Sequence, residues 1–437
     1  VKRQTSFVCC GGALAVRGLR SCGPGQIHER QLRSGAASNL CPHMSSNSSG
    51  GPAIRISLHD SIHLIHREDW ELVAKEAGPY LQYDYLCALE DAMAGSMEFR
   101  YAIHYCEQNL PMGIVHFQLV DLVDHGSSYR EALGRLGKAL GSRTLKEMRL
   151  RTLVNGNVFH CGDHGSFFRH GVDAAYRLKA VEDTLWKLGT ADYFHPKVSA
   201  LLLKDMPAPR TEGAESLTDR GYHAMAMDVN MVLDVDPEWQ DLSGYAQALN
   251  SKSRTRLNAL MARSSALLIR ELPVHEILES TDDLQRLFNN VLDRSPFSFG
   301  RLNMQVYAAW KEQLGDRLLF RGFYLNDELV GFSSACVVGD TLDVQYVGID
   351  YARNEEHAIY QRMLVDLLDF ALRNNVQRIN YGRTAEQAKS NLGALPHGTR
   401  IYVKHRNAIA NKLIGPFLRS VEPGAFELRS PFKKVLA

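Results

Sequence analysis

The chain has 437 residues, of which 45% are hydrophobic and 23% charged, a composition typical of a globular protein with more than one domain. Its 50 Lys and Arg almost balance its 49 Asp and Glu, which argues against binding of nucleic acid or membrane through bulk charge but leaves room for a local basic patch. No uninterrupted apolar run reaches the ~18–20 residues of a membrane span, so the sequence excludes an integral membrane protein.

The first 50 residues differ from the rest of the chain. They are rich in Gly, Ser and Arg, show no sustained periodicity, and run into a Ser/Asn/Gly stretch at residues 45–51. We expect residues 1–50 to be a disordered or spurious N-terminal extension, with translation beginning at Met44. The apolar run at residues 7–16 is short and broken by glycine, which makes it a weak signal peptide.

The eight cysteines are distributed unevenly, four in the first 41 residues and four singly through the rest. Scattered single cysteines in a large chain indicate reduced core residues rather than a disulfide framework. The expected location is therefore cytoplasmic, with a peripheral position at the inner membrane surface compatible with it.

Residues 51–235 alternate between strand and helix patterns. The turn Asn109-Leu110-Pro111 predicts a hairpin, and Asn155-Gly156-Asn157 places a second turn signal inside the segment 150–159. The expected strands are 54–58, 99–105, 113–122, 150–159, 196–204 and 225–233, and the expected helices are 67–77, 80–93 and 173–188.

Residues 236–437 repeat this order. Asn326-Asp327-Glu328 predicts a hairpin, and Gly315 is suited to end the helix before it. The expected strands are 266–272, 318–325, 329–338, 341–348, 378–381 and 400–404, and the expected helices are a basic one at 242–263 and others at 281–293, 304–314, 357–374 and just after 383. The fold class is therefore α+β, with two domains (51–235 and 236–437), each a mixed, mostly antiparallel sheet flanked by helices.

Several segments resemble the GNAT superfamily, in its group of FemABX-like peptidoglycan aminoacyltransferases and their acyl-CoA-using relatives. Residues 248–256 look like the basic helix at the start of the group's transferase domain, and 319–338 like its central hairpin. Residues 344–351 with 358–364 look like its donor-binding strand and helix. Most characteristic is the stretch Ile379-Asn380-Tyr381-Gly382-Arg383-Thr384-Ala385-Glu386, followed by Lys389 and by Leu392-Gly393-Ala394. Residues 155–157 and 161–165 are similar to a less specific strand–loop pattern of the group.

The resemblance implies two GNAT-like domains in tandem and an N-acyltransferase. It would move an acyl group, rather than an aminoacyl group, from an acyl-CoA-type thioester to an amine in lipid or cell-envelope metabolism. The implied partners are the thioester donor and the amine, without DNA, and with peripheral membrane contact allowed. The alternatives are a FemABX-like aminoacyl-tRNA-dependent transferase, for which tRNA is the partner, and a non-catalytic binding protein on a GNAT scaffold.

One segment departs from the pattern of the superfamily. Acetyl-CoA-using members carry a glycine-rich pyrophosphate loop before the long helix, whereas residues 353–357 here read Arg-Asn-Glu-Glu-His. Backbone amides at a helix N-terminus can still bind phosphate, but Glu355 and Glu356 would oppose an anion. Acyl-CoA stays the expected co-substrate, with a carrier-bound thioester or an aminoacyl-tRNA as alternatives. The expected donor-binding residues are Asn354, His357, Tyr360 and Arg362.

The segment after residue 378 supplies candidates for acyl transfer to an amine, which needs a base and donors for the developing oxyanion. Thr384 and Gln387 have the spacing of a capping box, which would start a helix after Arg383 and leave this arginine at the strand-to-helix corner. Glu386 is the expected general base, with Arg383 as oxyanion donor. Lys389 and Tyr381 are expected to contact substrate. The alternative is a surface ion pair between Glu386 and Lys389, which are three residues apart on one helix face.

Two further tyrosines complete the candidates. Tyr346 lies on the strand expected to splay beside the donor and is assigned as an acid for the leaving thiolate; Tyr307 is assigned to the acceptor side. The alternative for each is a half-buried aromatic with a solvated hydroxyl. The cations of the basic helix form either a solvated face or an attraction for donor phosphates or lipid head groups; they are Lys252, Arg254, Arg256 and Arg263.

Two histidine clusters suggest a metal at first sight. His59, His63 and His66 have helical spacing, but the segment before them reads as strand and no HExxH pattern follows. The set His160, Cys161, His164 and His170 lies in a glycine-containing turn that the family resemblance explains without metal. No metal is expected.

Overall fold

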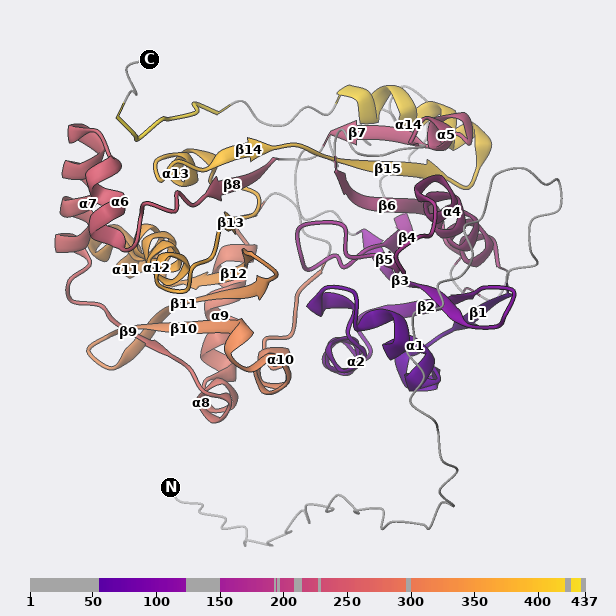
Figure 1. Cartoon of the computed structure of the whole chain (residues 1–437), viewed down its shortest axis with the longest axis horizontal. Helices are drawn as coiled ribbons and strands as arrows, with labels where there is room; N and C mark the ends of the chain where they lie inside the picture. Colours follow the sequence, from indigo (N-terminus) through magenta and orange to yellow (C-terminus); the bar gives the residue numbers. More distant parts are fainter. Residues whose placement is uncertain are drawn as a thin grey trace, which may run out of the picture. The chain divides into compact units, whose positions relative to one another are not determined.

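The computed structural model describes residues 55–122, 150–191, 194, 197–207, 214–226, 229–295, 300–420 and 426–433 (Figure 1). The extension expected at residues 1–50 and the translation start expected at Met44 lie outside the described residues. Among the described residues, no helix combines the length and the apolar character that crossing a membrane requires.

The first sheet has eight strands and is antiparallel except where β4 runs parallel to β6. In spatial order they are β1 (Arg55–His59), β2 (Glu98–Tyr105), β3 (Pro111–Leu122), β4 (Leu150–Asn155), β6 (Ala200–Pro207), β15 (Thr399–His405) and β7 (His223–Ala226), with β5 (Ser166–Phe168) paired to β3. The helices of this half are α1 (Arg67–Ala74), α2 (Tyr83–Ala92), α4 (Ala174–Thr190) and α5 (Ala214–Asp219).

The second sheet has seven strands and one parallel pair, β12 with β13. Its order is β14 (Leu395–His397), β8 (Asn230–Asp234), β13 (Arg378–Asn380), β12 (Thr341–Ile349), β11 (Glu328–Val338), β10 (Leu318–Leu325) and β9 (Leu268–Glu271). The helices of this half are α6 (Leu242–Ala248), α7 (Ser251–Arg263), α8 (Val274–Glu279), α9 (Thr281–Leu292), α10 (Val306–Leu314), α11 (Tyr351–His357), α12 (Ile359–Arg373) and α13 (Glu386–Ser390). The last helix, α14 (Ala408–Ser420), follows β15 and packs on the first sheet.

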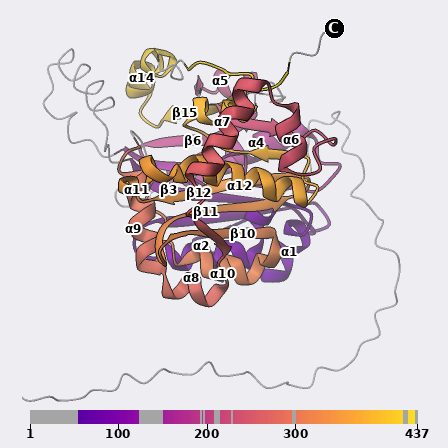
Figure 2. The same cartoon turned by 90° about the vertical axis from the view of Figure 1, so that its left-hand side faces the viewer.

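Alternation along the strands puts one core on each face of the second sheet. Phe320 and Phe332 pack in the cluster that holds α8, α9 and α10, whereas Leu319 and Ala335 pack with α12. Figure 2 shows these helix groups on opposite sides of β10–β12. The expected fold class is confirmed: two mixed, mainly antiparallel sheets flanked by helices.

The two sheets exchange strands, which the sequence did not reveal. The segment expected as one strand at 225–233 forms two, β7 in the first sheet and β8 in the second, so that expectation is wrong. Both strands are largely apolar, which hides the crossing in the pattern. The strand expected at 400–404 exists as β15, but it lies between β6 and β7 of the first sheet. The domain boundary at 235–236 stays a prediction beside these findings.

The helix expected at 242–263 is broken, and here too the expectation is wrong. Asn250 ends it: its side chain accepts a hydrogen bond from the amide of Ser253 and caps α7, while its own amide donates to the carbonyl of Pro431. Leu249 forms a bridge with Phe432. An asparagine followed by a serine is an N-cap signal, so the break was readable.

The hairpin expected around residues 326–328 is confirmed. Asn326 and Asp327 have φ values of 49° and 66°, the left-handed region that a tight turn of this kind requires, and β10 pairs with β11 on either side of them. On its other side β11 pairs with β12, the strand on which the candidate site is built.

Candidate functional site

The parallel pair β12–β13 is short and then opens. Thr341–Asp343 pair with Arg378–Asn380, after which β12 continues to Ile349 while the other chain turns away at Gly382, whose φ is 71°. Among the described residues, no strand pairs with residues 344–349 on this edge. The result, where the two strands separate, is an opening with an unpaired edge of β12 inside the second half.

A β-bulge shapes the same strand. The register of β11 with β12 shifts between Ser333 and Ala335, and the Ser334 hydroxyl fills the gap. Its oxygen accepts from the amide of Tyr346 at 3.0 Å and its proton donates to the carbonyl of Tyr346 at 3.1 Å. The hydroxyl of Tyr307 lies 2.9 Å from that of Ser334 and donates to Gln345 at 3.0 Å. Tyr346 and Tyr307 are therefore brought together through Ser334, and burial raises the pKa of both hydroxyls.

Lys389 lies at the other side of the opening. Its ammonium donates to the carbonyls of Gly382 at 3.1 Å and Arg383 at 2.5 Å, and the residue is only 4% exposed. Burial lowers its pKa to about 8, against the opposing effects of Cys161 and Glu386. An amine with a pKa near neutrality is able to exchange a proton at physiological pH.

Cys161 approaches the opening from the first half, and sequence reasoning assigned it no role. A Cβ atom on Gly382 would lie 3.6 Å from its sulfur and 3.8 Å from the carbonyl oxygen of Val344. Its thiol also acts on the pKa of both Tyr346 and Lys389. Only its position in a turn containing two glycines could have suggested that it lies close to another chain segment.

The loop that carries Cys161 is anchored by a buried ion pair. Lys204 and Asp205, at the end of β6, form a salt bridge, and Lys204 donates to the carbonyl of His160 at 2.5 Å. Asp205 accepts from the amide of Gly162 at 3.0 Å and from the guanidinium of Arg383. Burial would raise the pKa of Asp205, but Lys204 and Arg383 outweigh it and hold this pKa below its ordinary value.

Arg383 therefore lies at the corner where it was expected, but its charge is already matched by Asp205. It also donates to the Thr399 hydroxyl at 3.3 Å, and its side chain is 14% exposed. The arginine thus ties the second half to β6 and β15 of the first sheet.

The capping box expected from Thr384 and Gln387 is wrong. Thr384 and Ala385 both take left-handed conformations, with φ of 63° and 50°, and α13 begins only at Glu386 without a side-chain cap. The carbonyls of Gly382 and Arg383 instead bind the ammonium of Lys389, which fixes this turn. Glu386 is half-buried at the start of α13, where its charge acts on the pKa of Lys389 and of Tyr360.

A second buried network joins the halves beside the opening. Tyr80 donates to Asp343 at 2.6 Å, and Asn380 donates to the other carboxylate oxygen at 2.8 Å. Burial raises the pKa of Asp343 to about 6 despite these two bonds. The ring of Tyr80 stacks on His160 at 4.5 Å, and burial lowers the pKa of that imidazole.

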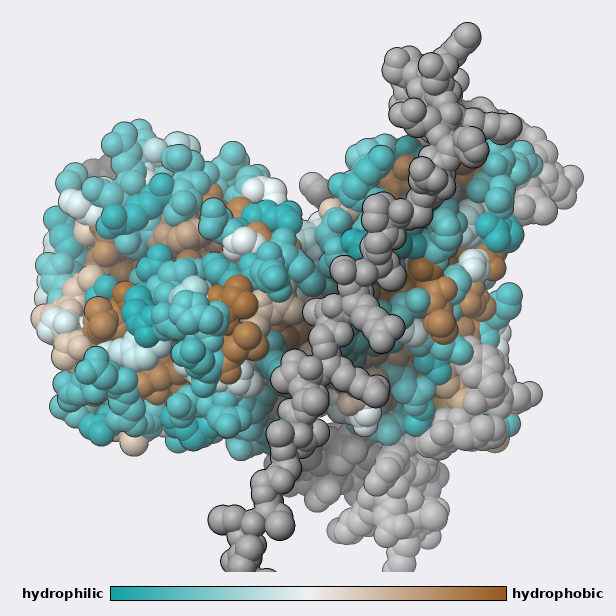
Figure 3. All heavy atoms as spheres, turned by 90° about the horizontal axis from the view of Figure 1, so that it is seen from below, coloured by the Kyte–Doolittle hydropathy of each residue, from teal (hydrophilic) through white to brown (hydrophobic). Residues whose placement is uncertain are grey.

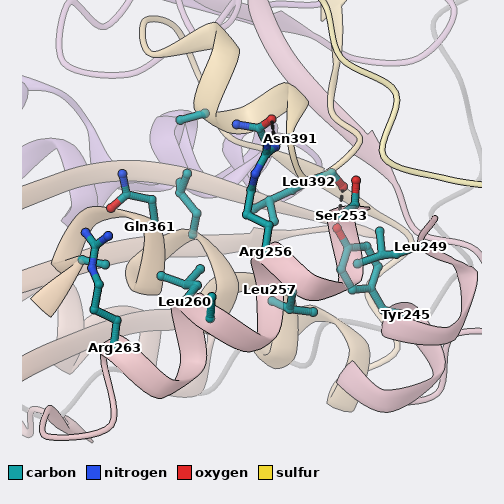
Figure 4. Close-up of a pocket in the computed structure, with 14 residues that line it drawn as sticks. Tyr245, Leu249, Ser253, Arg256, Leu257, Leu260, Arg263, Gln361, Asn391 and Leu392 are labelled. Carbon is teal, nitrogen blue, oxygen red and sulfur yellow. Dashed lines mark hydrogen bonds between the residues drawn. The ribbon is translucent and has the colours of Figure 1, made fainter. Parts of the chain in front are cut away.

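A pocket of about 340 Å³ lies on the outer side of α12 (Figure 4). Leucines and alanines dominate its lining, and Arg256 and Arg263 bring positive charge to it. Arg256 donates to Asn391 at 2.8 Å, and Arg263 to the carbonyl of Glu355. The residues that line the pocket are Tyr245, Leu249, Ser253, Arg256, Leu257, Ala259, Leu260, Arg263, Ala358, Gln361, Leu364, Ala388, Asn391 and Leu392.

Tyr381 lies between this pocket and the sheet. Its hydroxyl donates to the carbonyl of Leu364 at 3.1 Å, and both Leu364 and Tyr245 line the pocket. Tyr245 lies close enough to affect the pKa of Tyr381. Tyr381 is 3% exposed. The tyrosine supports the pocket wall.

The four residues expected to bind the donor do not line the pocket. The Asn354 side chain accepts from the amide of Tyr360 at 2.9 Å and thereby occupies one of the free amides of α12. His357 lies 3.8 Å from Glu356. Tyr360 is largely buried, with a raised pKa, and Arg362 acts on the carboxylate of Asp366. Residues 353–357, which read Arg-Asn-Glu-Glu-His, belong to the helix α11, which Asp350 caps.

Within the part of the chain that the structure describes, no three His, Cys, Asp or Glu side chains are arranged to hold a metal ion. His63 instead contacts Asp91 at 2.8 Å, and His164 contacts the carbonyl of Cys161 at 2.9 Å.

No family model and no curated protein matches the sequence. Solved structures similar to the chain include a tandem GNAT protein from the clavulanic acid biosynthesis pathway, with 10% identity, 81% of this chain and 99% of that chain covered, and a TM-score of 0.47. FemX matches with 10% identity, 82% and 100% coverage, and a TM-score of 0.48. L-PGS from Bacillus licheniformis matches with 12% identity, 80% and 96% coverage, and a TM-score of 0.46. Such matches are too distant to transfer an activity, so the chain's own residues must support one.

Proposed function

We propose that the chain is an N-acyltransferase that moves an acyl group from an acyl-CoA-type thioester onto an amine in lipid or cell-envelope metabolism. The observation that carries this proposal is the open edge of β12 at residues 344–349, bordered by Tyr346 and the buried Lys389. The arm of a CoA-type donor is extended and contains amide groups, so it can pair with an open edge as an added strand does. Its thioester would then lie at the opening, next to the ionisable side chains.

The pocket beside α7 supplies the second half of the donor site in this proposal. Arg256 and Arg263 bring positive charge for the donor phosphates, and the aliphatic lining suits an apolar group of the donor. The cations of α7 therefore replace the missing glycine-rich loop, whose place α11 takes.

The reaction assigned to this site conserves atoms and protons. The amine nitrogen attacks the thioester carbonyl carbon, the carbon–sulfur bond breaks, and the donor leaves as a thiol. Glu386 is the proposed base that removes the proton from the amine, directly or through water, and Tyr346 the proposed acid for the thiolate. Lys389 adjoins the reacting groups, and Arg383, bound by Asp205, positions the corner from which Lys389 and Glu386 project.

The experiment that tests this proposal combines thermal shifts with thiol release, using acetyl-, medium-chain and long-chain acyl-CoA. A bound donor raises the stability by about 2.7 kcal/mol at a hundredfold excess over its Kd. Arg256→Ala should weaken donor binding about tenfold, because it removes a cation from the pocket. Lys252→Ala is the matched control, since Lys252 is exposed on the same helix but does not line the pocket.

Glu386→Gln and Tyr346→Phe should lower kcat about a hundredfold while donor binding is kept. Equal effects of the Arg256 and Lys252 variants, or wild-type turnover in the Glu386 and Tyr346 variants, would contradict the respective assignments. Turnover with an aminoacyl-tRNA but not with CoA esters would establish the aminoacyl alternative. Tight binding without turnover of any donor would establish a binding protein.

A further inference from the structure

Helix α14 packs on the first sheet through its polar side. The Asn411 side chain accepts from the amide of His405 at 2.8 Å and donates to the carbonyl of Gly221 at 2.8 Å. The carbonyl of Asn411 contacts the ring of His223 at 2.8 Å, and a Cβ on Gly415 would clash with that ring at 2.5 Å. Asn407 caps the helix by accepting from the amides of Ile409 and Ala410, both at 3.0 Å. Hydrogen bonds and close backbone approach therefore hold this helix in place.

The opposite side of α14 presents apolar side chains to solvent. Ile409 is 72% exposed and Leu413, one turn further, is 40% exposed, with Lys412 and Pro416 also exposed. No large hydrophobic side chain among the described residues is more exposed than Ile409. On the face shown in Figure 3, by contrast, apolar residues are scattered among hydrophilic ones. A helix that is fixed through its polar side and presents aliphatic residues to solvent is typical of a surface that binds a partner or a membrane.

The charge on α14 itself is positive. The sequence of α14 contains no Asp or Glu, and Lys412 stands between Ile409 and Leu413. Lys404, on the strand that leads into the helix, places its ammonium 4.0 Å from the ring centre of Trp186, which is 38% exposed. Gly221 lies close to both Asn411 of α14 and Lys404, because a Cβ on it would lie 3.6 Å from Asn411 and 4.0 Å from Lys404.

We propose that the exposed side of α14, formed by Ile409, Lys412 and Leu413, is a docking surface for an anionic lipid bilayer. Exposed aliphatic residues on one side of a helix with a cation between them match the interface between acyl chains and anionic head groups. A protein partner of matching charge would need an acidic rim, whereas a bilayer supplies both the apolar layer and the negative charge. The surface is separate from the proposed acyltransferase site and does not depend on its activity.

The test uses the full chain and sedimentation with sucrose-loaded vesicles, of phosphatidylcholine alone or with about one third phosphatidylglycerol. We expect binding to the anionic vesicles only, weakening as salt is raised. Ile409→Asp with Leu413→Asp should weaken it at least ~tenfold, because two aliphatic side chains no longer insert. Lys412→Glu should weaken it less, and its effect should shrink in high salt.

Leu64→Asp is the control, because Leu64 is 69% exposed outside α14 and the change adds one negative charge, as each of the two substitutions in α14 does. Both variants should keep the wild-type thermal transition, since the substituted side chains face solvent. No binding of the wild type to anionic vesicles, or equal losses in the Leu64 and α14 variants, would overturn the proposal. So would a dimer of the lipid-free wild type that the α14 variant dissociates without any vesicle binding, because the surface would then join two copies.

Discussion

Lys389 carries an ammonium group that is removed from water and held by two backbone carbonyls. A neutral amine has two N–H groups, which is the number that these carbonyls accept. Burial lowers the pKa to about 8 in the folded chain from the ordinary value of 10.5. Between these two pKa values Lys389 holds its proton in the unfolded chain but not in the folded chain, so the free energy of unfolding rises with pH.

Replacing Lys389 by Met should remove this dependence. The stability of the wild type relative to the variant should rise by about 2 kcal/mol between pH 7 and pH 9.5, because Met does not titrate. Urea denaturation of both proteins across this range measures the difference. A constant difference would mean that the folded-state pKa of Lys389 is close to that of a solvated lysine.

At the scale of single elements, Ser334 is the residue that the bulge in β11 requires. Its hydroxyl bonds both backbone groups of Tyr346 and contacts the hydroxyl of Tyr307. Ser334→Ala leaves those buried groups without this partner and should cost about 1–3 kcal/mol of stability. It should also lower any acyltransferase activity, because the position of Tyr346 is no longer fixed.

Ser333 provides the matched control one residue earlier. It is fully buried like Ser334, but its hydroxyl has no hydrogen-bond partner in the structure. Ser333→Ala removes a buried polar group without stranding another and should leave stability unchanged or raise it. Chemical denaturation of the two variants measures the difference. Similar losses of stability in both would mean that the lost side-chain volume, and not the hydrogen bonds of the bulge, causes the loss.

The sequence predicts elements where a local signal is strong and fails where a distant contact decides. The 326–328 turn follows from residues that tolerate positive φ, and the long helix at 359–373 from its apolar spacing. The capping box at Thr384 fails because the side chain of Lys389 captures the carbonyls of the turn. Likewise, Arg383 could be placed at a strand-to-helix corner, but its partner Asp205 is 178 residues away and no pattern links the two.

At the scale of the whole molecule, two of the polar contacts between the halves lie beside the candidate opening. Asp205 pairs with Arg383, and Tyr80 with Asp343, so one strand end from each half is fixed to the other half. The apolar core is shared as well, since Tyr85 stacks on Trp310 at 4.5 Å. The position of Cys161 next to Gly382 and Lys389 depends on these contacts, because its loop belongs to the first half and the opening to the second.

The exchange of β8 and β15 makes a strong prediction about the two halves as separate pieces. In a fragment of residues 55–235, β7 loses β15, its only strand neighbour in the described part of the chain, and the edge of β6 is exposed. The β8 strand in the same fragment loses both of its neighbours, β13 and β14. An apolar strand with unpaired backbone groups is an aggregation site rather than a stable edge. We therefore expect the fragment to be aggregated or to lack a cooperative thermal transition, whereas the chain from residue 55 onward unfolds in a single one.

Co-expression with residues 236–437 should restore a soluble complex, because β8 and β15 then regain their sheets. A sharp transition in the isolated fragment would show instead that the first half forms a domain without β15, and that the boundary expected at residue 235 is an autonomous one.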